Sequence, residues 1–453
     1  MSIERKNVEA LIDNSVAVLP RRLREAKAAP SISLSDFKAY MPVHRYIFIP
    51  TRDLWPAASV DARLPWPIGP KGKPIKPSKY LDKNAPVEQM TWAPGMPKFI
   101  ADRLIDAGGW IEREGCTTFN LYRPPTVKPG DARDVVPWLR HVRRVYRRHA
   151  NYIIRWLAHR VQDPEVKINH ALVLGGRQGI GKDTILEPVK YAVGPWNFVE
   201  VSPPALLGRF NGFVKSVILR VSEARDLGDV DRFAFYEHMK VYTAAPPDVL
   251  RCDEKNLREH DVPNVCGVII TTNYKSNGIY LPADDRRHYV AWSDSEKEDF
   301  SEAYWRGIWD WYADGGIENV AAYLARLDLA GFDPKAPPPK TDAFWHIVDA
   351  ARSPEEAELA DVLDSLGNPE AVTLDMLKQN AKIRDEELAA WLSDRRHRRQ
   401  IPHRLEAVGY EPVRNEARKD GLWVIQDRRQ AVYARTALSI RDRITAAAAL
   451  ANR

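Results

Sequence analysis

A glycine-rich stretch, LVLGGRQGIGKDTIL at 172–186, holds residue types that bind phosphate. Gly176, Gly179 and Gly181 let the backbone curl so that successive N–H groups point inward, and a following helix adds the positive end of its dipole. Lys182 stands where an ammonium reaches the β- and γ-phosphates of a nucleotide. Because an apolar strand precedes the glycines and a helix follows, we predict a nucleotide site with ATP and Mg²⁺ as cofactors.

The residue after this lysine departs from the usual pattern G-x-x-x-x-G-K-[ST]. That position normally carries a hydroxyl that binds Mg²⁺, but here it is Asp183, with Thr184 one residue later. The second apolar segment, SVILRVSEA at 216–224, also departs, because Ser222 stands where a metal-orienting Asp is usual. Two interpretations stay open: Asp183 supplies, directly or through water, the charge that Ser222 lacks, or Asp183 faces outward and Thr184 binds the metal.

Two further polar residues follow apolar segments. Glu223 comes at the end of its segment, where a general base could activate water, although an ordinary exposed acid is the alternative. Asn273 ends VCGVIITTN and could orient the attacking water, although Asn after a strand often begins a turn. Both are predicted to serve ATP hydrolysis.

A pair of arginines precedes the last apolar segment of this region, in PADDRRHYV. Arg286 or Arg287, supplied by a neighbouring subunit, could stabilise charge on the transferring phosphoryl group. Salt bridges to Asp284 or Asp285 are the alternative.

Short apolar segments are expected to position these residues. INHALVLGG before the loop, together with 216–224, 265–273 and 286–292, has the composition of buried strands, and TILEPVKYAV after the loop favours a helix. Apolar strands alternating with helices predict an α/β core whose parallel strands are buried on both faces.

Positive charge is concentrated in two islands. The formal net charge is +6 over 453 residues; residues 391–453 hold 14 Lys/Arg against 7 Asp/Glu, and residues 131–160 hold 8 Arg against 2 Asp. Such islands favour a polyanionic partner, although a solvated helix face is the alternative for each. The candidates for contact with duplex DNA phosphates in the C-terminal island are Arg395, Arg396, Arg398, Arg399 and Arg404.

The order and spacing of these features resemble superfamily 3 helicases. GGRQGIGKDT, VSEARD, ITTN and DDRRHYV carry the resemblance, which covers about 135–300 and is nearest to phage and plasmid primase–helicases, including the helicase domain attached to NrS-type polymerases. It implies an AAA+ ATPase that forms a homo-oligomeric ring, usually a hexamer, and moves along DNA. The phosphate lysine, base, first sensor and arginine finger of the family map, in that order, onto Lys182, Glu223, Asn273 and either Arg286 or Arg287.

In that family a hairpin between the second and third of these strands projects into the ring channel and holds DNA. The matching stretch is VLRCDEKNLREH at 249–260, with Lys255 at its turn and Arg251 and Arg258 beside it. Cations there would contact phosphates without reading sequence, and a solvated surface turn is the alternative. The resemblance thus implies single-stranded and forked DNA as partners. We recognise no primase in the chain, so a separate primase or polymerase of a phage or mobile element is expected.

The predicted fold class is α/β: an AAA+ P-loop NTPase core with an irregular N-terminal region and a winged-helix-like α+β domain at the C-terminus. The predicted parts are an irregular Pro- and aromatic-rich region, a basic helical lead-in, the ATPase core, a helical segment with a Pro-rich linker, and the basic C-terminal domain: 1–130, 131–165, 166–300, 301–345 and 346–453. In the last part we expect helices near 355–366, 373–381 and 385–400, a hairpin at 421–435 and a terminal helix; Pro402 predicts a helix break near Gln400.

Several classes of protein are disfavoured. No apolar run approaches the roughly 18 residues of a membrane helix, and the charged N-terminus lacks the apolar stretch of a signal peptide, so a cytoplasmic protein without a membrane partner is expected. Three dispersed cysteines, Cys116, Cys252 and Cys266, predict reduced thiols and argue against a zinc site. The alternatives are a DNA-binding AAA+ regulatory or origin-assembly ATPase that does not unwind DNA and, less well supported, a small-molecule kinase.

Overall fold

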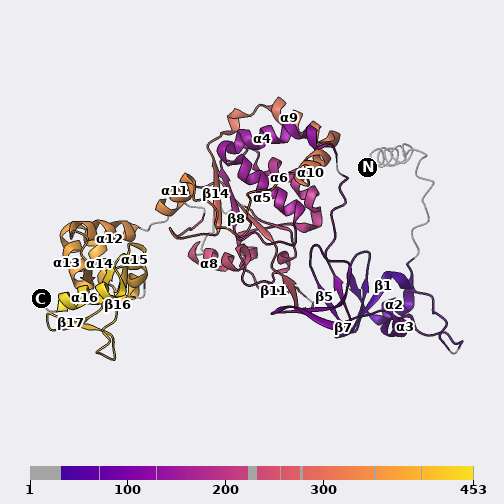
Figure 1. Cartoon of the computed structure of the whole chain (residues 1–453), viewed down its shortest axis with the longest axis horizontal. Coiled ribbons are helices and arrows are strands. Elements are labelled where there is room, and N and C mark those ends of the chain that lie inside the picture. The colour runs from indigo at the N-terminus through magenta and orange to yellow at the C-terminus, as the bar shows by residue number, and fades with distance from the viewer. Residues whose placement is uncertain are drawn as a thin grey trace, which may run out of the picture. The chain divides into compact units, whose positions relative to one another are not determined.

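Figure 1 shows the computed structural model of the chain. The chain divides into two compact units. Their described residues are 32–70, 72–128, 130–222, 232–255, 257–275, 279–350, 354–398 and 400–451. The first unit comprises Met1–Pro124, Phe210–Lys215 and Pro247–Asn264. The second comprises Pro125–Arg209, Ser216–Pro246 and Val265–Arg453.

Two small sheets make up most of the first unit. One has the order β3-β2-β1-β4 and the other β5-β7-β6. Their strands are β1 (Phe37–Tyr40), β2 (Arg45–Phe48), β3 (Asp53–Trp55), β4 (Pro86–Val87), β5 (Gln89–Thr91), β6 (Phe99–Asp106) and β7 (Gly109–Asn120). Helices α2 (Ala57–Arg63) and α3 (Pro77–Asn84) pack on the first sheet, around buried Phe37, Tyr46 and Leu81.

From residue 32 onward, the described part of the N-terminal region is therefore more regular than its proline content predicted. The prolines between the two helices lie in the connection, where no ladder or helix hydrogen bond is lost. Pro77 begins α3, and at this position a missing N–H costs little because first-turn N–H groups have no partner within the helix.

A hairpin from the middle of the chain also belongs to this unit. It consists of β11 (Val249–Cys252) and β12 (His260–Pro263), which pair antiparallel as the segment 249–260 predicted. Strand β12 packs against β5 and β6, and the Thr91 hydroxyl donates to the Asp261 carbonyl at 2.8 Å. The hairpin and Phe210–Lys215 thus lie outside the compact unit that contains the remainder of the predicted core, 166–300.

The centre of the second unit is a five-stranded parallel sheet with the order β14-β8-β13-β10-β9. Its strands are β8 (Ala171–Gly176), β9 (Phe198–Val201), β10 (Ile218–Val221), β13 (Gly267–Thr272) and β14 (His288–Ser293). Every residue of β8 and β13 is buried, which explains their apolar composition. The parallel α/β core is confirmed, and β9 is an additional strand that the sequence analysis did not predict.

Helices cover this sheet. α4 (Val136–Tyr146), α5 (Ala150–Gln162), α6 (Lys182–Val193) and α10 (Ile317–Leu324) pack against one another as one group (Figure 1). α8 (Arg232–Thr243) packs against β13 and α11 (Asp342–Ala350) against β14. The remaining helices of this part are α7 (Pro203–Leu206) and α9 (Glu302–Trp311).

The C-terminal part combines helices with a three-stranded antiparallel sheet of order β15-β19-β16 and a hairpin, β17–β18. Its helices are α12 (Pro354–Ser365), α13 (Leu374–Arg384), α14 (Glu386–Ser393), α15 (Ile401–Ala407) and α16 (Ile440–Ala451). Its strands are β15 (Ala371–Thr373), β16 (Tyr410–Val413), β17 (Trp423–Ile425), β18 (Arg428–Gln430) and β19 (Val432–Arg435). The winged-helix assignment stays a prediction.

Two expectations for this part need correction. The helix predicted at 385–400 ends at Ser393, because the Asp394 side chain accepts from the Arg396 N–H and caps a separate 3-10 turn. The helix break predicted near Gln400 is present, since Gln400 is the N-cap of α15 and Pro402 lies in the first turn of that helix. The predicted hairpin at 421–435 is shorter, since β19 leaves β18 and joins the other sheet.

Candidate functional site

The glycine-rich loop joins the end of β8 to the start of α6. Gly176, Gly179 and Gly181 all have positive φ, at 143°, 81° and 89°, where side chains are strained. A Cβ atom on Gly181 would lie 2.6 Å from the His141 ring, and one on Gly176 would lie 2.7 Å from Ile180 Cδ1. Glycine is therefore required at these two positions on both conformational and steric grounds.

Lys182 and Asn273 meet at this loop. Lys182 is only 9% exposed, and its Nζ donates to the carbonyls of Gly176 (2.7 Å) and Arg177 (2.8 Å) and to Asn273 Oδ1 (2.8 Å). Burial lowers its pKa to about 8, partly opposed by the charge of Asp183. All three ammonium donors are used, so a phosphate bound here would have to replace at least one acceptor.

Asp183 has a partner that neither interpretation of the sequence included. Arg220 of β10 donates from Nη2 to Asp183 Oδ1, and its Nη1 lies 3.4 Å from Glu200 Oε2 on β9. The Arg220 side chain is 12% exposed and that of Asp183 is 76% exposed. Thr184, by contrast, is buried in the first turn of α6. Asp183 is thus neither a free metal ligand nor a bystander in this state.

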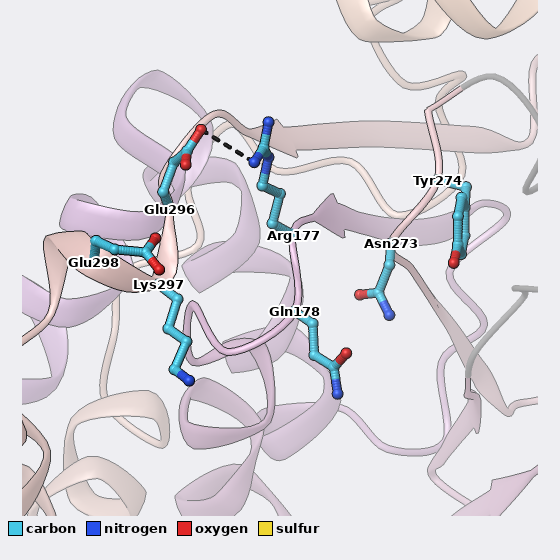
Figure 2. Close-up of a pocket in the computed structure, with 7 residues that line it drawn as sticks. All are labelled: Arg177, Gln178, Asn273, Tyr274, Glu296, Lys297 and Glu298. Atoms are coloured by element: carbon cyan, nitrogen blue, oxygen red, sulfur yellow. Dashed lines mark ion pairs between the residues drawn. The ribbon is translucent and has the colours of Figure 1, made fainter.

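A cavity of about 400 Å³ opens beside the loop. Figure 2 shows Arg177 turned toward Glu296, with which it forms an ion pair at 3.3 Å, while Asn273 and Tyr274 line the other side. The remaining lining residues are Gln178, Lys297 and Glu298. The volume falls within the range of small-molecule sites.

The residues fit the phosphates of a nucleotide. Only glycine is tolerated where the backbone curls, the helix α6 starts at the loop, and Lys182 supplies an ammonium at its base. For Mg²⁺ the candidate oxygens belong to Asp183, Thr184 and Ser222. Ser222 follows β10, and its N–H donates to the carbonyl of Val201 at the end of β9.

Side chains from distant elements hold the loop and the first turn of α6. His141 of α4 contacts the Gly181 carbonyl through Nε2 (3.0 Å) and the Tyr304 hydroxyl through Nδ1 (2.8 Å). Burial lowers the pKa of His141, so the neutral ring donates from Nε2 and accepts at Nδ1. The Tyr312 hydroxyl donates to the Thr184 carbonyl at 2.7 Å. Apart from the apolar face of 136–146 and the aromatic residues after 300, no sequence pattern indicated these contacts.

Arg286 and Arg287 lie at the opposite end of the sheet from the loop. The Arg287 carbonyl accepts from the Ala171 N–H, at the start of β8. The six residues of β8 separate this point from the loop, a span of about 20 Å at roughly 3.3 Å per residue. Asp285 is buried and bonded to Tyr236 and His288 through its carboxylate. Neither arginine is near the loop of its own chain.

The hairpin cations lie at the surface. Lys255 and Arg258 are exposed, and Arg251 forms an ion pair with Glu259 across the hairpin. In the C-terminal part Arg395 and Arg398 are exposed, and Arg396 pairs with Asp394 at 2.6 Å.

Two further predicted residues, Glu223 and Arg399, lie outside the described residues. Arg404, also among the C-terminal candidates, pairs with Glu356.

Comparison with known proteins gives a fold relationship. Residues 174–287, less than half of the chain, match DUF5906, a family of unknown function. The apo structure of the NrS-1 C-terminal region aligns with a TM-score of 0.58 and 16% identity, covering 88% of this chain and 96% of that chain. The chain shares that fold. An A-form apo structure of the same region aligns with a TM-score of 0.53 and 15% identity, covering 84% and 91%.

No curated protein matches the chain. Among the described residues, no helix has both the length and the apolar character that a bilayer crossing requires.

Proposed function

We propose that this chain is an ATP-dependent DNA helicase or translocase, working as a homo-oligomeric ring, expected to be a hexamer, in the replication of a phage or other mobile element. Hydrolysis of ATP, bound with Mg²⁺, would drive movement along single-stranded or forked DNA. The site that binds it is the loop of β8 and α6, and the hairpin and the C-terminal arginines would contact DNA phosphates.

The contact between Lys182 Nζ and Asn273 Oδ1 at 2.8 Å carries this proposal. It joins the loop to the end of the third predicted strand through side chains 91 residues apart. A phosphate that takes the place of Asn273 as an acceptor of Lys182 would free the Asn273 amide to orient water. The lysine and the first sensor would therefore respond to nucleotide together.

Phosphate entry is also favoured by the lysine's own electrostatics. Burial lowers the Lys182 pKa to about 8 because an ammonium is poorly solvated there, and a bound anion would stabilise the charged form. Glu223 is proposed as the general base. The finger, Arg286 or Arg287, would act on the site of a neighbouring subunit, since about 20 Å of strand separates it from its own loop.

The deciding experiment measures ATP hydrolysis with and without single-stranded DNA, on protein sized by light scattering, and unwinding of a forked duplex. We expect Mg²⁺-dependent hydrolysis that rises with DNA, and loss of hydrolysis in Lys182→Ala. Wild-type turnover in Lys182→Ala would refute the nucleotide site.

A DNA-binding AAA+ ATPase that assembles on DNA without unwinding it is the second candidate. It is favoured by the hairpin: Arg251 is neutralised by Glu259, and β12 packs against β5 of the N-terminal unit. Hydrolysis stimulated by DNA, together with an oligomer that leaves forked duplex intact, would select this candidate over the helicase.

A further inference from the structure

Three side chains with metal-binding atoms lie together at the base of the β11–β12 loop. Cys252 ends β11 and His260 begins β12, and the two are direct cross-strand partners in the ladder. Partners of this kind project from the same face of a hairpin. Glu254 follows two residues after Cys252, and the ligand atoms of all three lie within 4.8 Å of one another. Cys252 is 0% and His260 7% exposed.

The hydrogen bonding of the two ring nitrogens of His260 indicates a ligand. Its Nδ1 lies 3.4 Å from the Arg258 carbonyl, which makes Nδ1 the protonated nitrogen. Its Nε2 is buried and has no hydrogen-bond partner among the described residues, a costly condition for a polar atom. Histidines that bind metals commonly donate one ring N–H to a backbone carbonyl and present the other nitrogen to the ion.

We propose that Cys252 Sγ, His260 Nε2 and a Glu254 carboxylate oxygen form a Zn²⁺ site, with water as the fourth ligand. Sulfur, imidazole and carboxylate together are the donor types of zinc, and their distances from one another suit ligation at about 2.0–2.3 Å after small side-chain adjustments. Glu254 is partly exposed, which leaves an entry path for the ion. When the Sγ–Zn bond forms, the thiol proton leaves to solvent.

Lys215 opposes metal in this cluster. Its Nζ lies 2.5 Å from Glu254 Oε2, so without metal the ammonium balances the carboxylate and leaves the second carboxylate oxygen for an ion. Burial raises the pKa of Cys252 to about 12, while the charge of Lys215 acts to lower it. Zinc would bring positive charge beside the Lys215 ammonium, so removal of Lys215 should strengthen zinc binding.

Metal at this position would hold together the two strand ends that flank Lys255. Asn211 already holds the same hairpin, accepting from the Asp253 N–H (2.7 Å) and donating to the Arg251 carbonyl (2.7 Å). A metal ion bound by both Cys252 and His260 would link the end of β11 to the start of β12. The binding of zinc itself does not depend on the proposed helicase function.

The test is titration of the full-length, metal-free protein with Co²⁺ in a reducing buffer, followed by competition with Zn²⁺. We expect one Co²⁺ per chain with a thiolate-to-cobalt charge-transfer band, displaced by Zn²⁺, and a higher melting temperature with Zn²⁺. Cys252→Ser should abolish the band, whereas the matched control Cys116→Ser should retain it. Lys215→Met should tighten binding by roughly fivefold or more, the effect of removing one nearby charge.

Two results would overturn the site. One is a wild-type protein that binds no Zn²⁺ by native mass spectrometry, a measurement that needs no variant to fold. The other is metal binding that is equal in Cys252→Ser, folded as judged by circular dichroism, and in Cys116→Ser, since that binding would be adventitious.

Discussion

Arg220→Met provides the sharpest test of how the site handles Mg²⁺. Arg220 holds the Asp183 carboxylate through Oδ1 in the nucleotide-free state, so its positive charge competes with a metal ion for this carboxylate. We expect the substitution to release Asp183 and to lower the Mg²⁺ concentration at half-maximal hydrolysis. Methionine keeps much of the side-chain volume of arginine without its charge.

The size of the effect follows from exposure. With Asp183 76% exposed, solvent screens the pair strongly, and two charges about 4 Å apart in water interact by about 1 kcal/mol. Since about 1.4 kcal/mol is a tenfold change in an equilibrium constant, the Mg²⁺ midpoint should fall roughly fivefold. Glu200→Gln is the matched control of opposite sign, because it removes the other acid near Arg220 and leaves Asp183 more tightly held.

The assay is Mg²⁺ titration of both hydrolysis and fluorescent-nucleotide binding, with melting temperatures recorded in nucleotide-free buffer. Asp183→Asn should raise the Mg²⁺ midpoint and should lose its sensitivity to Arg220→Met, because the two residues act through one contact. If a folded Arg220→Met protein has an unchanged Mg²⁺ midpoint, Arg220 and Mg²⁺ do not compete for Asp183, and the metal would be assigned to Thr184 alone.

Three further outcomes follow from the site. Because the pKa of Lys182 is lowered to about 8, ATP affinity should fall as pH rises above about 8. The unfolding free energy of the free protein should rise between about pH 8 and 10.5, because Lys182 is then protonated in the unfolded state and deprotonated in the folded state. Lys182→Met should remove both pH dependences. Mixing Lys182→Ala subunits with Arg286→Ala or Arg287→Ala subunits should partly restore hydrolysis, and failure in mixed oligomers of verified composition would contradict action between subunits. Lys255→Ala should weaken single-stranded DNA binding with basal hydrolysis intact and reduce the salt slope by roughly one, and an unchanged slope with normal unwinding would remove the hairpin from the DNA path.

Much of the proposed nucleotide site was predictable because its signals are local. Glycines, a lysine and a helix start within a dozen residues specify the loop, and positive φ at Gly176, Gly179 and Gly181 is the backbone state that only glycine adopts easily. Short apolar runs likewise indicated four of the five parallel strands. The fifth, β9, is only four residues long, partly exposed and at the sheet edge, so its composition was less distinctive.

Arg220 marks where prediction from the sequence could have gone further. A charge within the apolar run SVILRVSEA requires a partner, because a buried guanidinium without one is costly. The segment SVILRVSEA therefore predicts an ion pair for Arg220. It did not signal Asp183, which lies 37 residues away on α6 and meets Arg220 only after the strand and helix pack.

The sequence by itself determined the chemistry of the loop and the α/β character of the core, because these depend on residues adjacent in the chain. Only the tertiary structure decided which partners those residues meet. In the folded chain, Asp183 pairs with Arg220, and Arg286 and Arg287 lie at the end of the sheet opposite the loop. The 249–260 hairpin packs on strands of the N-terminal unit. The tertiary structure also brought Cys252 opposite His260, a pairing that counting cysteines misses. Such contacts arise from strand order and register, which join segments that no local pattern connects.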